Sequence, residues 1–141
     1  MDPVIRVALR EDPLDPGALV AEVGRPDSGA TALFLGTARD HSDGKTGVTH
    51  LEYEAYAEHV EPRLREICEE AAARWPVLSM VVEHRVGDVK VGEASVAVAV
   101  ATAHRGDAFE AARHVIDELK KRVPIWKREH WPGGAEWVEG A

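Results

Sequence analysis

The chain has 141 residues, of which 45% are hydrophobic and 30% are charged, and its formal net charge at pH 7 is −8. This length and composition suit one globular domain over residues 1–141 and exclude an intrinsically disordered chain, which would be poorer in apolar residues. The negative charge argues against general binding of DNA or RNA, because such binding needs a broad basic surface.

No stretch approaches the roughly 18 apolar residues of a membrane-spanning helix, and the first residues do not form a basic and apolar signal segment. We therefore expect a cytoplasmic protein that does not contact a membrane. Cys68 is the only cysteine in the sequence, which excludes an internal disulfide and a four-cysteine zinc site. The seven histidines lack the paired helical spacing of metal ligands, so we predict no metal site. We also expect no other cofactor.

The first third of the chain predicts a strand, a short helix and a second strand. Residues 4–9 have the composition of a strand, and Asp15 then caps a helix that Gly24 ends. The run 29–38 is rich in small and apolar residues and predicts a buried strand. This strand delivers Arg39 to its carboxyl end.

The next segments predict a loop, a strand and a long helix. Residues 40–47 are polar and contain two glycines, which is typical of a loop, whereas 48–56 alternates like a strand. Between 57 and 75 the apolar residues recur at steps of three and four, which predicts a helix with one buried stripe that Pro76 ends. Cys68 falls on this stripe, so we expect a small buried side chain rather than a catalytic thiol.

Two strand patterns, 77–86 and 94–103, are long enough to pair as an antiparallel arm. A second long helix follows, with Asp107 as its expected cap and Val123-Pro124 as its end, because proline cannot continue a helix. Its predicted buried stripe consists of Ala108, Phe109, Ala112, Val115, Ile116, Leu119 and Val123. Residues 125–128 are expected to be extended, with a turn over 132–134 and a short tail beyond it.

The most unusual stretch of this acidic chain is the basic segment 119–128, which holds five cations and no acid. The proline break leaves Lys120 on the last helical turn and Lys127 beyond it, so two amines can approach one pocket from different backbone directions. Two alternatives stay open at this point. Cations in a last helical turn complement the helix dipole, and a basic run can also bind RNA or an acidic protein tail.

Cationic side chains stand at three predicted element ends. These are Arg39 with His41, His104 with Arg105, and Lys120 with Lys127. Together they predict a binding site for a small, multiply charged anion, assembled where strands give way to loops and helices. A lysine crowded by other cations loses basicity, so it can act as an acid, a base or a nucleophile near neutral pH.

Five segments form a recognisable set in chain order. They are Phe34-Leu35-Gly36-Thr37-Ala38-Arg39, Leu51-Glu52-Tyr53, His84-Arg85-Val86-Gly87, Ala103-His104-Arg105 with Ala108-Phe109, and Lys120-x-Arg122-x-Pro124-x-Trp126-Lys127-Arg128-Glu129. This set closely resembles the large, catalytic subunit of molybdopterin synthase. The resemblance runs from about residue 15 to Val138, and the last two segments are its most specific part.

The resemblance implies an α+β fold of the α/β-hammerhead type, with mostly antiparallel sheet, two main helices and a β-rich subdomain. It also implies a homodimer at the centre of a heterotetramer, with one small ubiquitin-like sulfur-carrier subunit docked at each end. The implied reaction is a sulfur transfer. The carboxyl-terminal Gly-Gly thiocarboxylate of the carrier supplies two sulfurs to cyclic pyranopterin monophosphate, which gives the dithiolene of molybdopterin.

The resemblance further implies roles for five residues. Lys120 matches the catalytic lysine, either as an acid/base or as a transient acyl acceptor, and Lys127 matches a second essential lysine that binds substrate and stabilises developing charge. Arg39, His104 and Arg105 match the residues that bind the anion, and His104 is also a candidate proton shuttle.

Members of this family often extend past the Trp-Val-Glu motif with a basic residue that reaches the pocket of the neighbouring subunit. The present sequence stops at Gly140-Ala141, so the resemblance leaves open whether the tail contributes across the dimer. The competing hypothesis is a non-catalytic module that binds RNA or an acidic protein tail through residues 120–128. Such binding would weaken strongly with salt and would be indifferent to pterins.

Overall fold

The structure is a computed structural model that describes residues 2–42 and 44–138; Gly140-Ala141 and the role of the tail lie outside the described residues. Its helices are α1 (Pro16–Val23), α2 (Ala57–Arg74) and α3 (Arg105–Arg122). Its strands are β1 (Val4–Arg10), β2 (Ala30–Thr37), β3 (His41–Ser42), β4 (Lys45–Thr46), β5 (His50–Ala55), β6 (Val77–Arg85), β7 (Gly87–Lys90), β8 (Ala94–Thr102), β9 (Ile125–Trp131) and β10 (Gly134–Val138).

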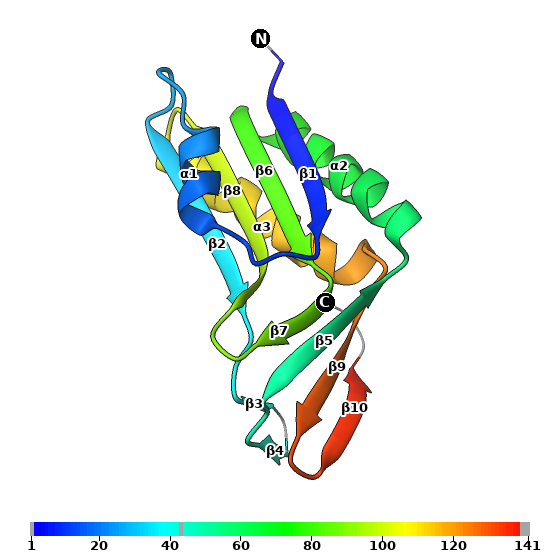
Figure 1. Ribbon diagram of the computed structural model, residues 1–141. Coiled ribbons are helices and arrows are strands. Elements are labelled where there is room, and N and C mark those ends of the chain that lie inside the picture. The colour runs from blue at the N-terminus through cyan, green and yellow to red at the C-terminus, as the bar shows by residue number, and fades with distance from the viewer. Residues whose placement is uncertain (1, 43, 139–141) are drawn as a thin grey trace.

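The first sheet has the strand order β1-β6-β8-β2, in which β1 runs parallel to β6 and the other pairs are antiparallel. Helices α2 and α3 cover one face of this sheet and α1 covers the other (Figure 1). The alternation along β8 explains the two layers. Its valines pack into the main core with α2 and α3, whereas its alanines leave room for Leu19 and Val23 of α1.

The second sheet has the order β10-β9-β5-β7 and extends beyond the first, with the small hairpin β3–β4 beside it (Figure 1). Strand β7 follows β6 almost directly, and β9 follows α3 after the break at Pro124. The prediction of an α+β fold with two main helices and a separate β-rich part is therefore confirmed. No helix in the described ranges is both long enough and apolar enough to cross a membrane.

The caps of α1 agree with the sequence analysis, but the predicted cap of α3 is wrong. Asp15 Oδ1 accepts a hydrogen bond from the Ala18 amide at 3.1 Å, as expected for the N-cap of α1. Helix α3 begins earlier than expected, at Arg105, because the chain turns into the helix at His104, where the Thr102 hydroxyl donates to the His104 carbonyl at 2.6 Å. Asp107 therefore sits in the first turn, where its charge favours the helix dipole.

Four other details of the prediction change. Phe109 is 65% exposed rather than part of the buried stripe, and Ala111 contributes to the core instead. The expected loop 40–47 contains the hairpin β3–β4, and the expected tail forms β10 against β9. Residues 87–90, expected only to connect two strands, form β7 along β5. Each of these elements is stabilised by a partner strand that local sequence patterns do not reveal.

Candidate active site

A cavity of about 320 Å³ opens where the two sheets and the end of α3 meet. It is lined by Gly36, Thr37, Arg39, Leu51, Tyr53, Ser95, Val96, Ile116, Leu119, Lys120, Lys127 and Glu129. Five separate elements or their flanks contribute to this lining, so the cavity exists only in the folded chain. Three cations and one carboxylate line it, which gives it an excess of positive charge within an acidic protein.

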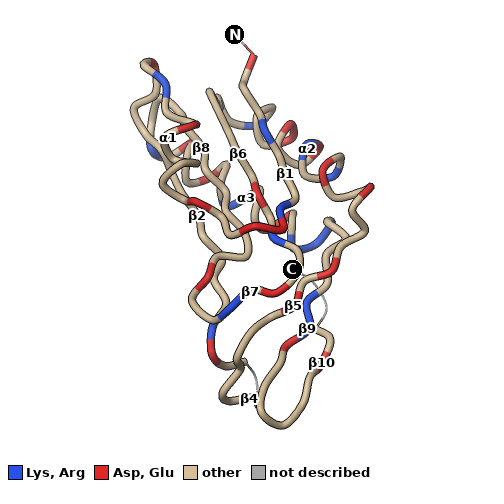
Figure 2. Tube along the Cα trace, viewed as in Figure 1, with Lys and Arg blue, Asp and Glu red and all other residues tan. Residues whose placement is uncertain are grey.

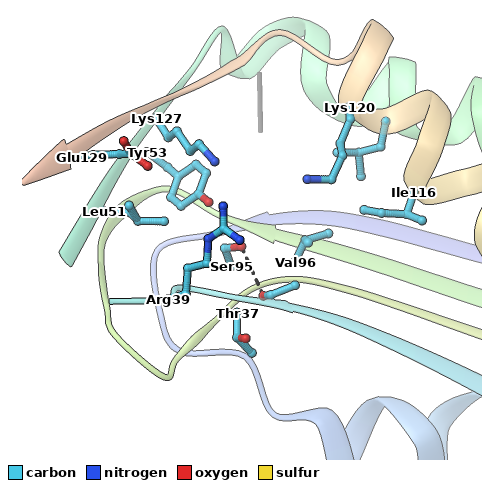
Figure 3. A pocket seen from close by; sticks show the side chains of 12 residues that line it. Thr37, Arg39, Leu51, Tyr53, Ser95, Val96, Ile116, Lys120, Lys127 and Glu129 are labelled. Carbon is cyan, nitrogen blue, oxygen red and sulfur yellow. Dashed lines mark hydrogen bonds between the residues drawn. The ribbon is translucent and has the colours of Figure 1, made fainter. Parts of the chain in front are cut away.

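The two lysines reach this cavity from opposite sides of the proline break, as predicted. Helix α3 ends when the Val123 amide bonds the Leu119 carbonyl at 3.0 Å, which leaves Lys120 on the last turn. Strand β9 then starts at Ile125, and its alternation turns Lys127 to the same face as the buried Ile125. Figure 3 shows the nitrogen ends of Lys120, Lys127 and Arg39 pointing toward one another across the cavity.

Arg39 enters the cavity from the chain just beyond β2. The residue before it, Ala38, is held on both sides of its backbone, because its amide donates to the Glu93 carbonyl at 3.0 Å and its carbonyl accepts from the Gly92 amide at 2.8 Å. The close approach of β2 and β8 also shapes the wall of the cavity. A methyl group on Gly36 would lie 2.6 Å from Cγ1 of Val96, so a side chain at this position would push into the cavity wall.

Four polar residues of the cavity were missed as site residues in the sequence analysis: Thr37, Tyr53, Ser95 and Glu129. Glu129 is only 5% exposed, and one of its oxygens accepts a hydrogen bond from the Ser42 hydroxyl at 2.9 Å. Alternation along β9 could have found it, because Glu129 lies two residues after Lys127 and therefore on the same face. Its carboxylate provides the only negative charge among the lining residues.

Tyr53 forms part of the inner wall. Strand β5 pairs with β9 so that Tyr53 lies beside Lys127, and the ring is 4% exposed. Burial raises the pKa of the Tyr53 hydroxyl, while its hydrogen bond with Ser95 opposes this effect. Ser95 in turn donates to the Gly36 carbonyl at 3.2 Å, at an irregularity in the β2–β8 pairing (Figure 3). Tyr53 therefore remains a neutral hydrogen-bonding group at ordinary pH.

The structure does not bring His104 and Arg105 to this cavity within one chain. Both stand at the amino-terminal end of α3, and neither lines the cavity. Lys120 lies 15 positions after Arg105, which corresponds to about 22 Å along an α-helix. His41, the expected companion of Arg39, instead lies beside Asp40, with its Nδ1 2.9 Å from a carboxylate oxygen. The prediction of one convergent set therefore holds for Arg39, Lys120 and Lys127.

The other cations of the segment 119–128 are engaged elsewhere. Arg122 forms two hydrogen bonds to Glu70 of α2, at 2.6 and 2.8 Å, and this hydrogen bonding lowers the pKa of the Glu70 carboxyl. Lys121 lies 3.5 Å from Glu118, and the Arg128 guanidinium lies 5.7 Å from the centre of the Trp137 ring. Acidic and basic residues are interspersed along α2 (Figure 2). A continuous basic surface for RNA is therefore not favoured.

The thiol of Cys68 is remote from this chemistry. Cys68 is fully buried on α2, and burial raises its pKa to about 12, so it carries no thiolate at neutral pH. Among the residues that the structure describes, no three His, Cys, Asp or Glu side chains come together as a metal-binding group. The lining residues offer two amines, a guanidinium, a phenol, two aliphatic hydroxyls and a carboxylate.

Comparison with known proteins places this geometry in context. The molybdopterin synthase catalytic subunit of Halalkalibacterium halodurans is 39% identical over 133 residues, which cover 94% of this chain and 85% of the relative. The crystal structure of molybdopterin synthase from Staphylococcus aureus has a TM-score of 0.87 at 31% identity, covering 92% of this chain and 94% of that one.

A more distant structure has the same fold. It is a complex of subunits 1 and 2 of the molybdopterin-converting factor from Helicobacter pylori, with a TM-score of 0.77 at 20% identity, and it covers 94% of this chain and 90% of that one. The model of the family described as MoaE protein matches residues 9–122. The cationic cavity thus lies in a chain that belongs to the MoaE protein family.

Proposed function

We propose that this chain is the catalytic subunit of a molybdopterin synthase, a sulfurtransferase of molybdenum cofactor biosynthesis. It converts cyclic pyranopterin monophosphate to molybdopterin with two sulfurs from the carboxyl-terminal Gly-Gly thiocarboxylate of a small ubiquitin-like carrier. The observation that carries this proposal is the convergence of Lys120, Lys127 and Arg39 on one cavity. The relatives support it, since proteins that are 39% and 46% identical to it over 94% and 93% of the chain are molybdopterin synthase catalytic subunits.

The charges in the cavity suit both reactants. The pterin substrate carries a phosphate and the carrier tail ends in an anionic thiocarboxylate, so cationic side chains can bind both. The sulfur must come from the carrier, because the one cysteine of this chain is buried and un-ionised. Each thiocarboxylate holds a single sulfur atom, so two loaded carriers are consumed for each dithiolene.

We assign roles to the three cations by their positions. Lys120 stands on the last turn of α3 and acts on the carrier terminus, as an acid/base or as a transient acyl acceptor. Lys127, beside Tyr53 on β9, binds the substrate and stabilises the charge that develops during transfer. Arg39, at the opposite wall, presents a planar guanidinium that suits a phosphate.

The proposal places the chain in the cytoplasm, where it acts as one domain over residues 1–141. Two copies form the homodimer at the centre of a heterotetramer, with one carrier docked at each end. The Helicobacter pylori structure, described as a complex of two subunits of the molybdopterin-converting factor, supports the association with a carrier.

The direct test of the proposed activity is to mix the purified chain with thiocarboxylated carrier and cyclic pyranopterin monophosphate and to detect the dithiolene product by mass spectrometry. A chain that binds the carrier but forms no dithiolene would refute the assignment.

Replacing Lys127 with methionine is expected to weaken substrate binding more than it slows turnover. Methionine keeps the aliphatic length of the side chain but loses a charge-assisted hydrogen bond, so KM for the pterin should rise about 10- to 100-fold. Steady-state kinetics with saturating carrier measure this change. The matched control is Lys121→Met, since Lys121 is 72% exposed and points to Glu118 outside the cavity. Equal KM values for the two variants would contradict the role of Lys127.

His104 and Arg105 enter the proposal as residues of a second copy of the chain. Neither can reach the cavity of its own chain, since they stand at the far end of α3 from Lys120. In a two-fold dimer, however, the same end of α3 can approach the cavity of the neighbouring chain. There the two side chains would add to the anion-binding set, as the family resemblance implies.

Mixed dimers test this arrangement. Lys120→Ala and His104→Ala chains should each be strongly impaired alone, but co-expression should restore about a quarter of wild-type activity, because half of the randomly formed dimers contain one intact site. A Lys120→Ala chain co-expressed with a Lys127→Ala chain is the control. Both of these residues belong to the same cavity, so no mixed dimer contains an intact site. If His104 acted within its own chain, the first mixture would stay as inactive as the control.

A further inference from the structure

His84 is a fully buried histidine directly behind the wall of the cavity. It stands near the end of β6, where it pairs with Val96 of β8 and continues the face of Met80 and Val82, which pack into the main core with α2 and α3. Val96 lines the cavity. The imidazole therefore lies next to a residue of the cavity wall.

The tautomer of His84 follows from its hydrogen bond. Nδ1 lies 2.7 Å from the Arg85 carbonyl oxygen, and because a carbonyl only accepts, Nδ1 must carry the hydrogen. Nε2 of the neutral ring then presents a lone pair. This atom is buried and has no hydrogen-bond partner among the described residues, although a buried acceptor is costly to leave unpaired.

Two contacts relate the ring to the cavity and to Lys120. The ring packs edge-to-face on Tyr53, with centroids 5.1 Å apart and planes inclined by 72°, and Tyr53 is part of the inner wall. Burial lowers the pKa of His84 to about 4, and the positive charge of Lys120 adds to this effect. His84 is thus an uncharged acceptor within the electrostatic reach of the lysine.

We propose that His84 is a positioning residue for Lys120, whose ammonium group donates a hydrogen bond to Nε2 and is thereby held at the inner end of the cavity. The long lysine side chain can reach this acceptor by rotation or through one bridging water molecule. The consequence for catalysis rests on the role proposed above for Lys120. An amine held at the inner wall lies where an inserted carrier tail would end.

The chemistry of the cavity explains why a neutral imidazole suits this position. A carboxylate there would bind the ammonium group more strongly, but its charge would repel the anionic thiocarboxylate and the phosphate. A protonated histidine would repel Lys120 and could not accept its hydrogen bond. The low pKa of His84 keeps the ring neutral over the working pH range, so the lysine is oriented without a change in the charge of the cavity.

The hydrogen bond can be tested without any substrate. In the full chain labelled with ¹⁵N at histidine, the Nε2 resonance of His84 should shift when Lys120 is replaced by methionine and should stay in place in Lys121→Met. The Nδ1 resonance should retain its protonated character in both variants, because its partner is a backbone carbonyl. An Nε2 resonance that is the same in wild type and Lys120→Met overturns the proposal, whatever the enzyme does.

Kinetics test the consequence for catalysis. His84→Phe fills the site without an acceptor and should lower kcat about tenfold with less than about a twofold change in KM for the pterin, whereas His84→Gln, which offers an oxygen near the position of Nε2, should recover most of the loss. In a Lys120→Ala background, His84→Phe should cause no further loss, because the two residues act as a unit. Equal impairment by Gln and Phe would indicate a packing role only and overturn the proposal.

A matched control separates this effect from the general loss of a buried imidazole. His114→Phe replaces a half-buried histidine that packs on Trp75 between α2 and α3, away from the cavity, and it should leave kcat unchanged. If Lys120→Met retained full activity while the His84 Nε2 resonance shifted, the hydrogen bond between Lys120 and His84 would be supported. The proposed catalytic role of Lys120 would then be refuted. The two proposals are therefore distinguishable.

Discussion

Replacing Lys120 with alanine is expected to reduce dithiolene formation by at least about 10³-fold, because both roles open to this lysine, acid/base catalysis and covalent acyl transfer, contribute factors of that size. Its position supports this expectation. The amine projects from the last turn of α3 toward Lys127 and Arg39, in the cavity where an anionic carrier tail can meet a phosphate-bearing pterin. The measurement is single-turnover product formation with saturating thiocarboxylated carrier.

The fold should survive this change. Lys120 is solvent-exposed, and alanine has a higher helix propensity than lysine, so the thermal unfolding midpoint should stay close to that of the wild type. The matched control is Lys121→Ala, one residue further along the same turn, whose side chain is 72% exposed outside the cavity. It should retain near-normal turnover. Comparable turnover in the two variants would show that Lys120 has no chemical role.

Lys120→Arg separates charge from chemistry. Arginine keeps a positive charge at this position but neither gives up a proton nor acts as a nucleophile near neutral pH. This variant should therefore bind the carrier and the pterin while remaining almost inactive. Mass spectrometry of the wild-type reaction, quenched early, distinguishes the two chemical roles, because a carrier covalently attached to Lys120 is expected only for the acyl acceptor.

Local signals in the sequence predicted most of the first sheet and its helices. The proline after Asp15, the apolar stripe of α2 and the break at Pro124 each act within a few residues, and the corresponding elements begin and end close to the expected positions. The break also predicted the convergence of Lys120 and Lys127, since a change of backbone direction between them follows from the proline alone.

The remaining details depend on residues far apart in the sequence. Strand β7 is short and gains its regularity from β5, more than 30 positions earlier, so its composition gives little indication of a strand. The extended segment was expected to end at residue 128, whereas β9 continues to Trp131, which is why Glu129 was not recognised as a neighbour of Lys127. His104 and Arg105 were grouped with the lysines by charge, whereas the full length of α3 separates them within the chain.

The sequence also could not reveal the environment of His84. In the sequence it belongs to a motif that resembles a family pattern, but nothing local predicts complete burial or an unpaired Nε2. Both properties arise from the packing of β6 between β1 and β8 and from the Tyr53 ring supplied by the second sheet. The same burial has a consequence for the stability of the whole chain.

Acidification from pH 7 to pH 4.5 is expected to reduce the free energy of unfolding by about 2 kcal/mol through His84 alone. Burial lowers the pKa of His84 from 6.5 in the unfolded chain to about 4 in the folded one. Between these values the unfolded state binds a proton that the folded state excludes, so the folded state loses stability as the pH falls. The loss begins near pH 6.5 and is complete near pH 4, below which both states are protonated.

Urea denaturation at pH 7, 6, 5 and 4.5, with a constant m-value, measures this dependence. The carboxyl groups of Glu22 and Glu70 have pKa values below their usual 4.5, each chiefly because of a hydrogen-bonded arginine, so their contributions are lost only at lower pH. His84→Gln cannot be protonated and should flatten the curve between pH 6.5 and 4.5, even if its stability at pH 7 is lower. The matched control is His59→Gln, which removes a histidine at an exposed position of α2 and should keep the wild-type slope. A wild-type slope in His84→Gln would show that other groups cause the acid sensitivity and that the His84 ring is not held neutral by burial.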